Sequence, residues 1–189
     1  MGRASRADAA RHRQEIVTAA SQLLRERGAE AVSVQEAMAA VGLTHGGFYK
    51  HFGSKGELFA SAAGAAFDDI SHTLDRIAAE SADEGDARRR VFDEYLAGPH
   101  RDDAAHGCAN TALAADAART DDPAFRAAYT EGLQRTVSRL AEIEGDAQDR
   151  RAAIADLIVL VGGLTLARAT AGDSVSDEIL EVARGLARR

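Results

Sequence analysis

Residues 33–55 read SVQEAMAAVGLTHGGFYKHFGSK, and this stretch decides the fold of the chain. Ser33 and Glu36 have the spacing of a capping box, in which the serine hydroxyl accepts from a free amide of a new helix while the glutamate reaches back. A helix is therefore predicted to begin at Val34. Gly42 ends it, because glycine adopts the left-handed backbone that commonly terminates helices. Apolar residues recur along one face at helical spacing: Val34, Ala37, Met38 and Val41.

A second short helix is predicted after this glycine, with Thr44 as its cap. Phe48 and Phe52 are four residues apart and are expected to face inward. A helix, a glycine turn and a second helix form a helix-turn-helix, whose second helix enters the major groove of DNA. The outward face of this second helix is polar, aromatic and basic: His45, Gly46, Tyr49 and Lys50.

A third helix is predicted to begin at about Lys55, because Ser54 and Glu57 repeat the spacing of a capping box. The free amides at its start, together with the Lys55 ammonium, suit a phosphate group. The alternative to a DNA-binding element is an ordinary helical hairpin with a glycine turn. That alternative does not explain why Tyr49, Lys50 and His51 occur together.

These residues resemble the DNA-binding segment of the TetR family of bacterial transcriptional regulators, of the TetR/AcrR type. The resemblance rests on several features: the turn at Gly42, the run FYKHF at 48–52, and the pair Ser54-Lys55. It implies a ligand-responsive DNA-binding regulator, most often a repressor. Such a protein binds a palindromic operator as a homodimer and is released by a small molecule or an electrophile.

Length and composition set outer limits. A chain of 189 residues allows one large domain or two small ones. The single cysteine, Cys108, excludes a disulfide within the chain and fits a reducing cytosol. The most apolar stretch, 157–167, is 11 residues long, whereas a bilayer span needs about 20. Residues 1–13 lack the apolar core of a signal peptide. We expect a soluble, cytoplasmic protein that does not bind membranes.

The charge is divided unevenly along the chain. The net charge is −7, which is unusual for a DNA-binding protein. Residues 1–55, however, hold six arginines, two lysines and five acidic residues, a balance of +3 that leaves −10 for the remainder. Both lysines of the chain, Lys50 and Lys55, lie in this basic part. A basic head on an acidic body directs the head toward a polyanion, although a chance division is the alternative.

The whole chain is predicted to be helical, so the fold class is all-α with about nine helices. We expect a helix-turn-helix DNA-binding domain at 1–53, called the head, and a ligand-binding and dimerisation domain at 54–189, called the body. Residues 1–10 are interpreted as a mobile arm or a terminus without a role. Outside the helix-turn-helix, helices are expected over 11–27, 54–80, 86–97, 108–119, 123–144, 146–171 and 174–187, with a loop over 100–106.

The resemblance implies which residues of the head touch DNA. Gly46 and Gly47 also lower the stability of the second helix, so we expect the free head to be partly mobile. Contacts to phosphates fix the position of the protein on DNA, and contacts to base edges read the sequence. The residues implied nearest the base edges are Gln35, His45, Gly46 and Lys50, and those implied at phosphates are Ser33, Thr44, Tyr49, His51 and Lys55.

The resemblance also implies that the last two helices pair across a two-fold axis as a four-helix bundle. The expected buried face of these helices includes Ile154, Leu157, Ile158, Val161 and Leu164 in the first, and Ile179, Leu180, Val182 and Leu186 in the second. The alternative is that these residues belong only to the core of one chain.

A small-molecule pocket in the body is implied as well. Cys108 follows a glycine at a helix start, as in a Gly-Cys subgroup of the family in which some members sense electrophiles or oxidants. A helix N-terminus favours the reactive thiolate, but a lone cysteine is more often a small buried apolar residue. The pocket residues are chosen as bulky or polar groups at inward positions, with ordinary core as the alternative: Phe67, Phe92, Tyr95, His106, Cys108, Asn110, Phe125 and Tyr129.

An enzyme is not indicated. His100, His106, Asp102 and Asp103 lie in one loop but match no metal-ligand spacing, so no metal site and no cofactor are expected. The chain contains no glycine-rich phosphate loop and no nucleophile elbow. A helical binding module without DNA is the second hypothesis. Steeply salt-dependent binding to DNA would separate the two.

Overall fold

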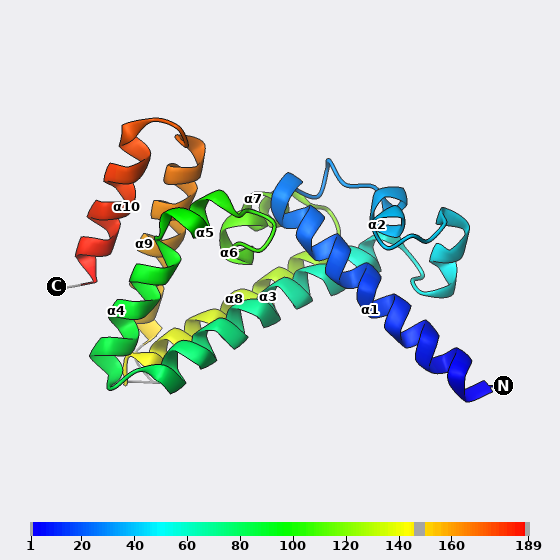
Figure 1. Ribbon diagram of the computed structural model, residues 1–189, viewed down its shortest axis with the longest axis horizontal. Helices are drawn as coiled ribbons and strands as arrows, with labels where there is room; N and C mark the ends of the chain where they lie inside the picture. Colours follow the sequence, from blue (N-terminus) through cyan, green and yellow to red (C-terminus); the bar gives the residue numbers. More distant parts are fainter. Residues whose placement is uncertain (1, 146–149, 188–189) are drawn as a thin grey trace.

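The computed structural model describes residues 2–145 and 150–187, and side chains from residue 6 onward. Over this range it is helical without a strand, which confirms the all-α prediction (Figure 1). The elements are α1 (Gly2–Arg27), α2 (Val34–Ala40), the 3-10 helix η1 (His45–Lys50), α3 (Lys55–Glu80), α4 (Glu84–Tyr95), α5 (Gly98–Asp102), α6 (Ala109–Ala112), α7 (Ala114–Arg119), α8 (Pro123–Ile143), α9 (Arg150–Ala169) and α10 (Ser174–Leu186).

Two predicted segments of the body differ from the observed ones, and the start of a third is not described. The loop expected over 100–106 begins with the short helix α5, because Pro99 suits the first turn of a helix. The helix expected over 108–119 is divided into α6 and α7 at Leu113. The expected start of the next-to-last helix, at 146, lies outside the described residues.

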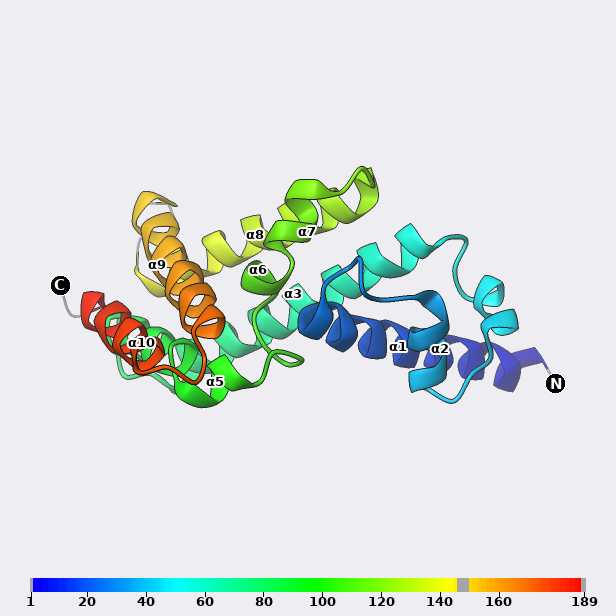
Figure 2. The ribbon, with the colours of Figure 1, turned by 90° about the horizontal axis from the view of Figure 1, so that it is seen from above.

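α3 and α8 are the long central helices and pack side by side along most of their length (Figure 1). α1, α2 and η1 gather at one end of this pair, and α9 and α10 stand at the other end (Figures 1 and 2). Gly132 of α8 allows the close approach, because a Cβ at this position would overlap the ring of Phe67 on α3. Nearer the head, a Cβ on Gly56 of α3 would overlap the carboxylate of Asp122, which caps α8.

α1 is longer than predicted. The segment interpreted as a mobile arm is helical from Gly2, so that interpretation was wrong. Arg11 forms ion pairs with Asp8 at 3.4 Å and with Glu15 at 2.9 Å, three and four residues away. Pairs at these spacings support an exposed helix, and the alanines of this segment have high helix propensity.

The two helix starts predicted from capping boxes, at Val34 and Lys55, are confirmed with one difference in detail. The Ser33 hydroxyl accepts from the Glu36 amide at 3.2 Å and the Glu36 carboxylate accepts from the Ser33 amide at 2.9 Å, which completes the capping box. At the second site the Ser54 hydroxyl accepts from the Glu57 amide at 3.1 Å. The Glu57 carboxylate, however, accepts from Gly53 at 2.7 Å and not from the cap itself.

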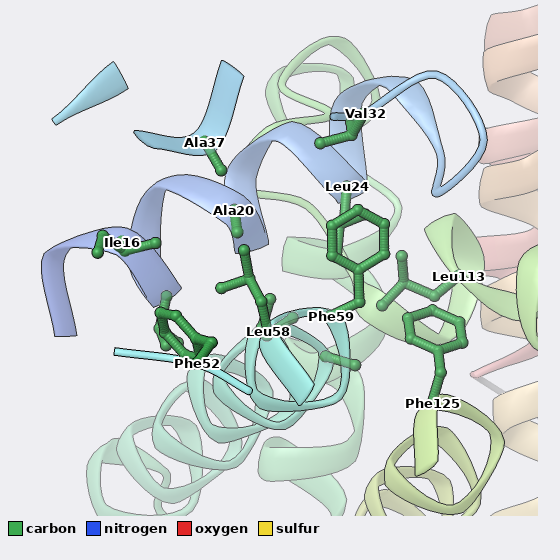
Figure 3. Packing of buried hydrophobic residues seen from close by; sticks show 14 of the residues in the cluster. Ile16, Ala20, Leu24, Val32, Ala37, Phe52, Leu58, Phe59, Leu113 and Phe125 are labelled. Atoms are coloured by element: carbon green, nitrogen blue, oxygen red, sulfur yellow. The ribbon is translucent and has the colours of Figure 1, made fainter. Parts of the chain in front are cut away.

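One apolar cluster joins the head to the near half of the body (Figure 3). Phe48 and Phe52 are each 2 % exposed, which confirms that they face inward. Phe59 of α3 lies beside Leu113 and Phe125, which come from the body (Figure 3). The core of the head is therefore continuous with the body through α3.

A second cluster fills the far half of the body, between α3, α4, α8, α9 and α10. Arg88 of α4 forms a two-pronged ion pair with Asp156 of α9, at 2.6 and 2.8 Å. By length and composition alone, α9 is apolar enough to cross a membrane, but 39 % of its most apolar window is buried in the protein. Core helices of soluble proteins pass the same test, so α9 is not a membrane signal.

The approach of α3 to α8 at Gly132 generates a prediction about stability. Gly132→Ala should lower the free energy of unfolding by about 1–3 kcal/mol, because the added methyl group overpacks the contact with Phe67. Urea denaturation measures this. Gly64→Ala is the matched control: no heavy atom lies within 4 Å of its added Cβ, so it should stabilise α3 by about 0.5–1 kcal/mol. Equal effects of the two substitutions would contradict the close approach.

Candidate DNA-binding surface and ligand cavity

The second helix of the helix-turn-helix is a single 3-10 segment, η1, and not an α-helix. Thr44 precedes it in extended conformation but makes no side-chain capping bond, so the expected cap is not formed. Gly46 and Gly47 follow, and they favour no helix. The short element still places Phe48 inward and leaves Tyr49 74 % exposed.

The residues expected at DNA lie on or beside α2, η1 and the start of α3. Lys50 is exposed at the end of η1 and makes no ion pair with any described residue. The Lys55 ammonium is engaged, because it donates to the Val32 carbonyl at 2.9 Å and lies over the Phe59 ring. His51 is half-buried, with its ring 6.2 Å from that of His12. The others are exposed: Ser33, Gln35, Thr44, His45, Gly46 and Tyr49.

A cavity of about 240 Å³ lies where α1 meets the body. Its walls come from α1, α3, α4, α5 and the segment before α6. Tyr95, His106 and Cys108 are the pocket residues chosen from the sequence that line it. The remaining lining residues were missed, since their positions resemble ordinary core or surface: Arg25, Asp69, Ile70, Thr73, Leu74, Ile77, Val91, Glu94, His100 and Gly107.

The other chosen pocket residues lie away from this cavity. Phe67 and Tyr129 pack edge to face, with ring centroids 5.5 Å apart. Phe92 is buried in the far cluster, and Phe125 is buried in the cluster shared with the head. The amide of Asn110 is buried as well and donates to Cys108 Sγ at 3.5 Å.

Arg25 is the one arginine among the described residues that line this cavity. It belongs to the last turn of α1, and its side chain is only 4 % exposed. Nη1 lies 3.0 Å from the Asp69 carboxylate on α3 and donates to the Gly107 carbonyl at 3.2 Å. The buried Nε makes no hydrogen bond among the described residues. The last turn of α1, a helix of the head, therefore contributes a side chain to the wall of the cavity.

His100 and Tyr95 also line the cavity. His100 Nδ1 lies 2.6 Å from the Tyr95 carbonyl, which only accepts, so Nδ1 carries the proton. Burial lowers the pKa of His100, and the nearby Arg168 lowers it further. The neutral ring therefore leaves Nε2 as an acceptor. Burial also raises the pKa of Tyr95, whose hydroxyl is 3.0 Å from that of Thr111, so this phenol stays protonated.

Cys108, which also lines the cavity, is 3 % exposed. It precedes α6, a helix of only four residues.

Among the described residues no group of three or more histidine, cysteine or acidic side chains could hold a metal ion.

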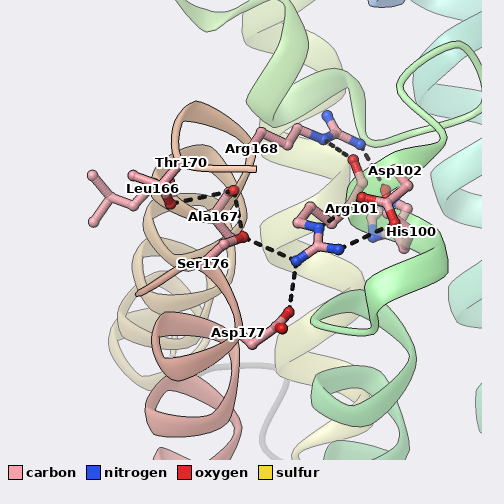
Figure 4. A network of polar contacts seen from close by, with 9 residues as sticks. All are labelled: His100, Arg101, Asp102, Leu166, Ala167, Arg168, Thr170, Ser176 and Asp177. Carbon is pink, nitrogen blue, oxygen red and sulfur yellow. Dashed lines mark hydrogen bonds and ion pairs between the residues drawn. The ribbon is translucent and has the colours of Figure 1, made fainter. Parts of the chain in front are cut away.

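Residues 98–108, from the start of α5 to Cys108, connect the cavity to the last two helices (Figure 4). Arg101 Nη1 donates to Ser176 Oγ at 2.9 Å and pairs with Asp177 at 2.7 Å, both on α10. Arg168 of α9 donates to the carbonyls of His100 and Arg101 at 2.9 and 3.1 Å. The wall of the cavity that carries His100 is thus fixed to α9 and α10.

At its other end the same segment contacts α1. His106 lies between two partners: its Nδ1 is 3.0 Å from the Asp103 carboxylate, and its Nε2 is 3.2 Å from the amide of Gln22. Gly107 receives the hydrogen bond from Arg25. Residues 98–108 therefore contact both the head and the helices at the far end of the body.

Large apolar side chains are exposed chiefly on α9 and α10. Ile154 and Ile158 are 44 % and 67 % exposed in the single chain. The alternative that they belong only to the core of one chain is therefore wrong for these two residues. A groove of about 420 Å³ runs between the two helices past Gly162 and Gly163. Of the seven exposed large apolar residues whose side chains the structure describes, all but Tyr49 lie on these helices: Ile154, Ile158, Leu166, Val175, Val182 and Leu186.

Residues 16–62 match the family model described as bacterial regulatory proteins, tetR family. No protein with a curated description matches the chain in sequence. The chain is similar to the solved structure of reduced NemR from E. coli, with 17% identity over 94% of this chain and 95% of that chain and a TM-score of 0.78.

Two further structures are similar over almost their whole length. One is a TetR-family transcriptional regulator from Agrobacterium tumefaciens, with 16% identity over 96% of this chain and 98% of that chain and a TM-score of 0.80. The other is SCO4454, a TetR-family transcriptional regulator from Streptomyces coelicolor, with 20% identity over 100% of this chain and 95% of that chain and a TM-score of 0.72. These similarities establish the fold.

The buried His100 generates a prediction about pH. Because its pKa is lowered in the folded protein, the unfolded chain binds the proton first as the pH falls below about 6.5, and stability decreases. His100→Asn keeps a donor for the Tyr95 carbonyl but has no proton to take up. This variant should lose less stability than the wild type between pH 7 and pH 5, measured by urea denaturation. His72→Asn, at an exposed position of α3, is the control. Identical pH profiles for His100→Asn and the wild type would contradict the prediction.

Proposed function

We propose that this chain, which has the N-terminal segment and the whole-chain fold of the TetR-family regulators, is a ligand-responsive DNA-binding transcriptional regulator. It binds a palindromic operator as a homodimer and represses transcription, as most members of the family do. A small molecule releases it from the DNA. The proposal places it in the cytoplasm and assigns it no catalysis.

The observation that carries the proposal is the exposed surface of α2 and η1. The match to the family model covers these elements, and the residues of this surface are polar, aromatic or basic around an inward pair of phenylalanines. Lys50 is exposed there, together with Gln35 and His45. In the proposal these side chains and the backbone at Gly46 approach base edges, and Tyr49 contacts a phosphate.

The remaining phosphate contacts are assigned to Ser33, Thr44, His51 and Lys55. Ser33 and Lys55 are bound within the head, through the Glu36 capping box and the Val32 carbonyl. On DNA, the Lys55 ammonium exchanges this carbonyl for a phosphate oxygen.

Dimerisation is proposed through α9 and α10. Their exposed apolar residues form one face, and Gly162, where an added Cβ would meet nothing within 4 Å, allows another helix to approach closely. Dimerisation buries this face and holds two heads at a fixed separation, as two half-sites of a palindrome require.

The proposal also assigns different roles to the two parts of the chain. Residues 1–53 bind DNA, and residues 54–189 bind the effector and form the dimer. The effector occupies the 240 Å³ cavity, which includes Tyr95, His106 and Cys108. The other inward residues named from the sequence support its walls as core.

A salt titration tests the DNA contacts. On DNA selected by the protein from a random library, Lys50→Ala should weaken binding by about 1–3 kcal/mol and relax specificity at one position of each half-site. Lys55→Ala should weaken binding evenly across sequences and lower the slope of log K against log salt by about 1 for each head. Gel shifts measure both. Arg135→Ala, on the surface of α8, is the control, and an equal loss for this variant would contradict the assignment.

Sedimentation tests the dimer. Ile158→Asp places a charge in the middle of the apolar face and should convert a micromolar dimer to monomer, because a buried unpaired charge is costly. Tyr49→Asp is the matched control: it changes the remaining exposed large apolar residue, in the head, and should weaken DNA binding while leaving the dimer intact. A wild-type protein that is monomeric at micromolar concentration would refute the arrangement.

A further inference from the structure

Apolar side chains form much of the wall of the 240 Å³ cavity. Ile70, Leu74 and Ile77 come from one face of α3, and Val91 of α4 belongs to the same wall. A dry cavity of about 150 Å³ in another protein binds benzene. This larger cavity therefore accommodates a single aromatic ring with a substituent, or another apolar molecule of that size.

The acidic residues of the wall disfavour a charged ligand. Asp69 is already paired with Arg25 at 3.0 Å, and Glu94 is paired with Arg76. An anion in the cavity would approach both carboxylates in a partly desolvated space. A cation would have to compete with an arginine for either carboxylate. An uncharged molecule meets neither obstacle.

His100 gives the cavity a free hydrogen-bond acceptor. Its ring is half-buried, and the proton is on Nδ1, which lies 2.6 Å from the Tyr95 carbonyl. Nε2 makes no hydrogen bond to any residue that the structure describes. It is also not one of the enclosed atoms without a partner, to which Arg25 Nε belongs, so Nε2 keeps accessible surface. A molecule in the cavity therefore finds an acceptor here.

This acceptor is held in place before any ligand binds. The His100 ring packs edge to face on the Tyr95 ring, with centroids 4.8 Å apart, and its backbone carbonyl accepts from Arg168 at 2.9 Å. Burial lowers the pKa of His100, so Nε2 carries no proton at neutral pH. A fixed, unprotonated acceptor binds a donor without a further loss of side-chain freedom.

The donors of the wall offer a ligand less. Thr73 Oγ1 donates to the Asp69 carbonyl at 3.0 Å, and Arg25 Nη1 donates to the Gly107 carbonyl at 3.2 Å. Arg25 Nε has no acceptor among the described residues, but protein atoms enclose it, so a molecule in the cavity does not reach it. A ligand therefore gains more by donating a hydrogen bond than by accepting one.

We infer that the cavity binds an uncharged, mostly apolar molecule with a hydroxyl or N–H group, and that this group donates to His100 Nε2. His100 belongs to residues 98–108, which contact α1 through Gly107 and α10 through Arg101. The ligand is thus bound to the segment that joins the head to the far helices. Only an effect on DNA binding rests on the proposed function. Occupation of the cavity does not.

Four probes of similar size test the inference: 4-methylphenol, 4-fluorotoluene, benzoate and benzylammonium. Ligand-observed NMR with the full chain at neutral pH measures their dissociation constants. 4-Methylphenol should bind at least about fivefold more tightly than 4-fluorotoluene, which has the same shape but buries Nε2 without a donor. It should also bind more tightly than either ion. Comparable binding of 4-fluorotoluene, tighter binding of an ion, or no binding of any probe at millimolar concentration would each overturn the inference.

His100→Asn assigns the effect to this residue. The asparagine amide donates to the Tyr95 carbonyl but is too short to place an acceptor at the position of Nε2. The advantage of 4-methylphenol over 4-fluorotoluene should therefore fall about fivefold. His72→Asn, at an exposed position of α3, is the matched control and should keep the advantage. Circular dichroism confirms folding, and an advantage that survives in folded His100→Asn contradicts the inference.

The nitrogen-15 chemical shift of His100 Nε2 reports the hydrogen bond in the wild-type protein, and it decides the question if His100→Asn does not fold. Because a donated hydrogen bond changes the shielding of an unprotonated ring nitrogen, 4-methylphenol should move this resonance and 4-fluorotoluene should move it much less. Equal shifts with the two probes, or no shift with either, would overturn the inference.

Gel shifts with and without 4-methylphenol separate this inference from the proposed function. Wild-type protein that binds 4-methylphenol selectively but binds no DNA would leave the ligand chemistry intact and refute the regulator. Protein that binds DNA but shows no preference for 4-methylphenol would do the reverse.

Discussion

The structure depends on one unbroken helix that belongs to two cores. α3 has 26 residues; its first half packs with the head and its second half with the far cluster of the body. Because an α-helix is stiff over this length, a displacement at one end is transmitted to the other. α8 packs along it, and this contact requires glycine at 132, where a side chain would collide with the Phe67 ring. A side chain at 56 would displace the Asp122 carboxylate that caps α8.

A second route joins the same two ends. Residues 98–108 contact α1 through His106 and Gly107, and they contact α10 through Arg101. The cavity lies between this segment and α3, so a molecule inside it contacts both connections at once. Allostery requires that the ligand bind two arrangements of the protein with different affinity.

The sequence was sufficient to predict the features of the fold that depend on the spacing of neighbouring residues. The Ser33 capping box, the glycine stop and the inward pair Phe48 and Phe52 lie within a few residues of one another, and the structure confirms them. Features that depend on distant partners were not predictable. Arg25 is distinguished from other arginines only by Asp69 and Gly107, which lie far along the chain. The periodic pattern of α9 indicated a buried face, but it does not state whether the same chain covers it.

Lys50 and Lys55 are the only lysines of the chain, and both lie within its first 55 residues. The ammonium of Lys55 is bound to the Val32 carbonyl, whereas that of Lys50 is exposed to solvent. Lys50 is thus the side-chain amine most open to acylation. Removal of this one charge would alter the surface assigned to DNA and leave the body chemically unchanged, so amine-directed reagents address a single functional region of the protein.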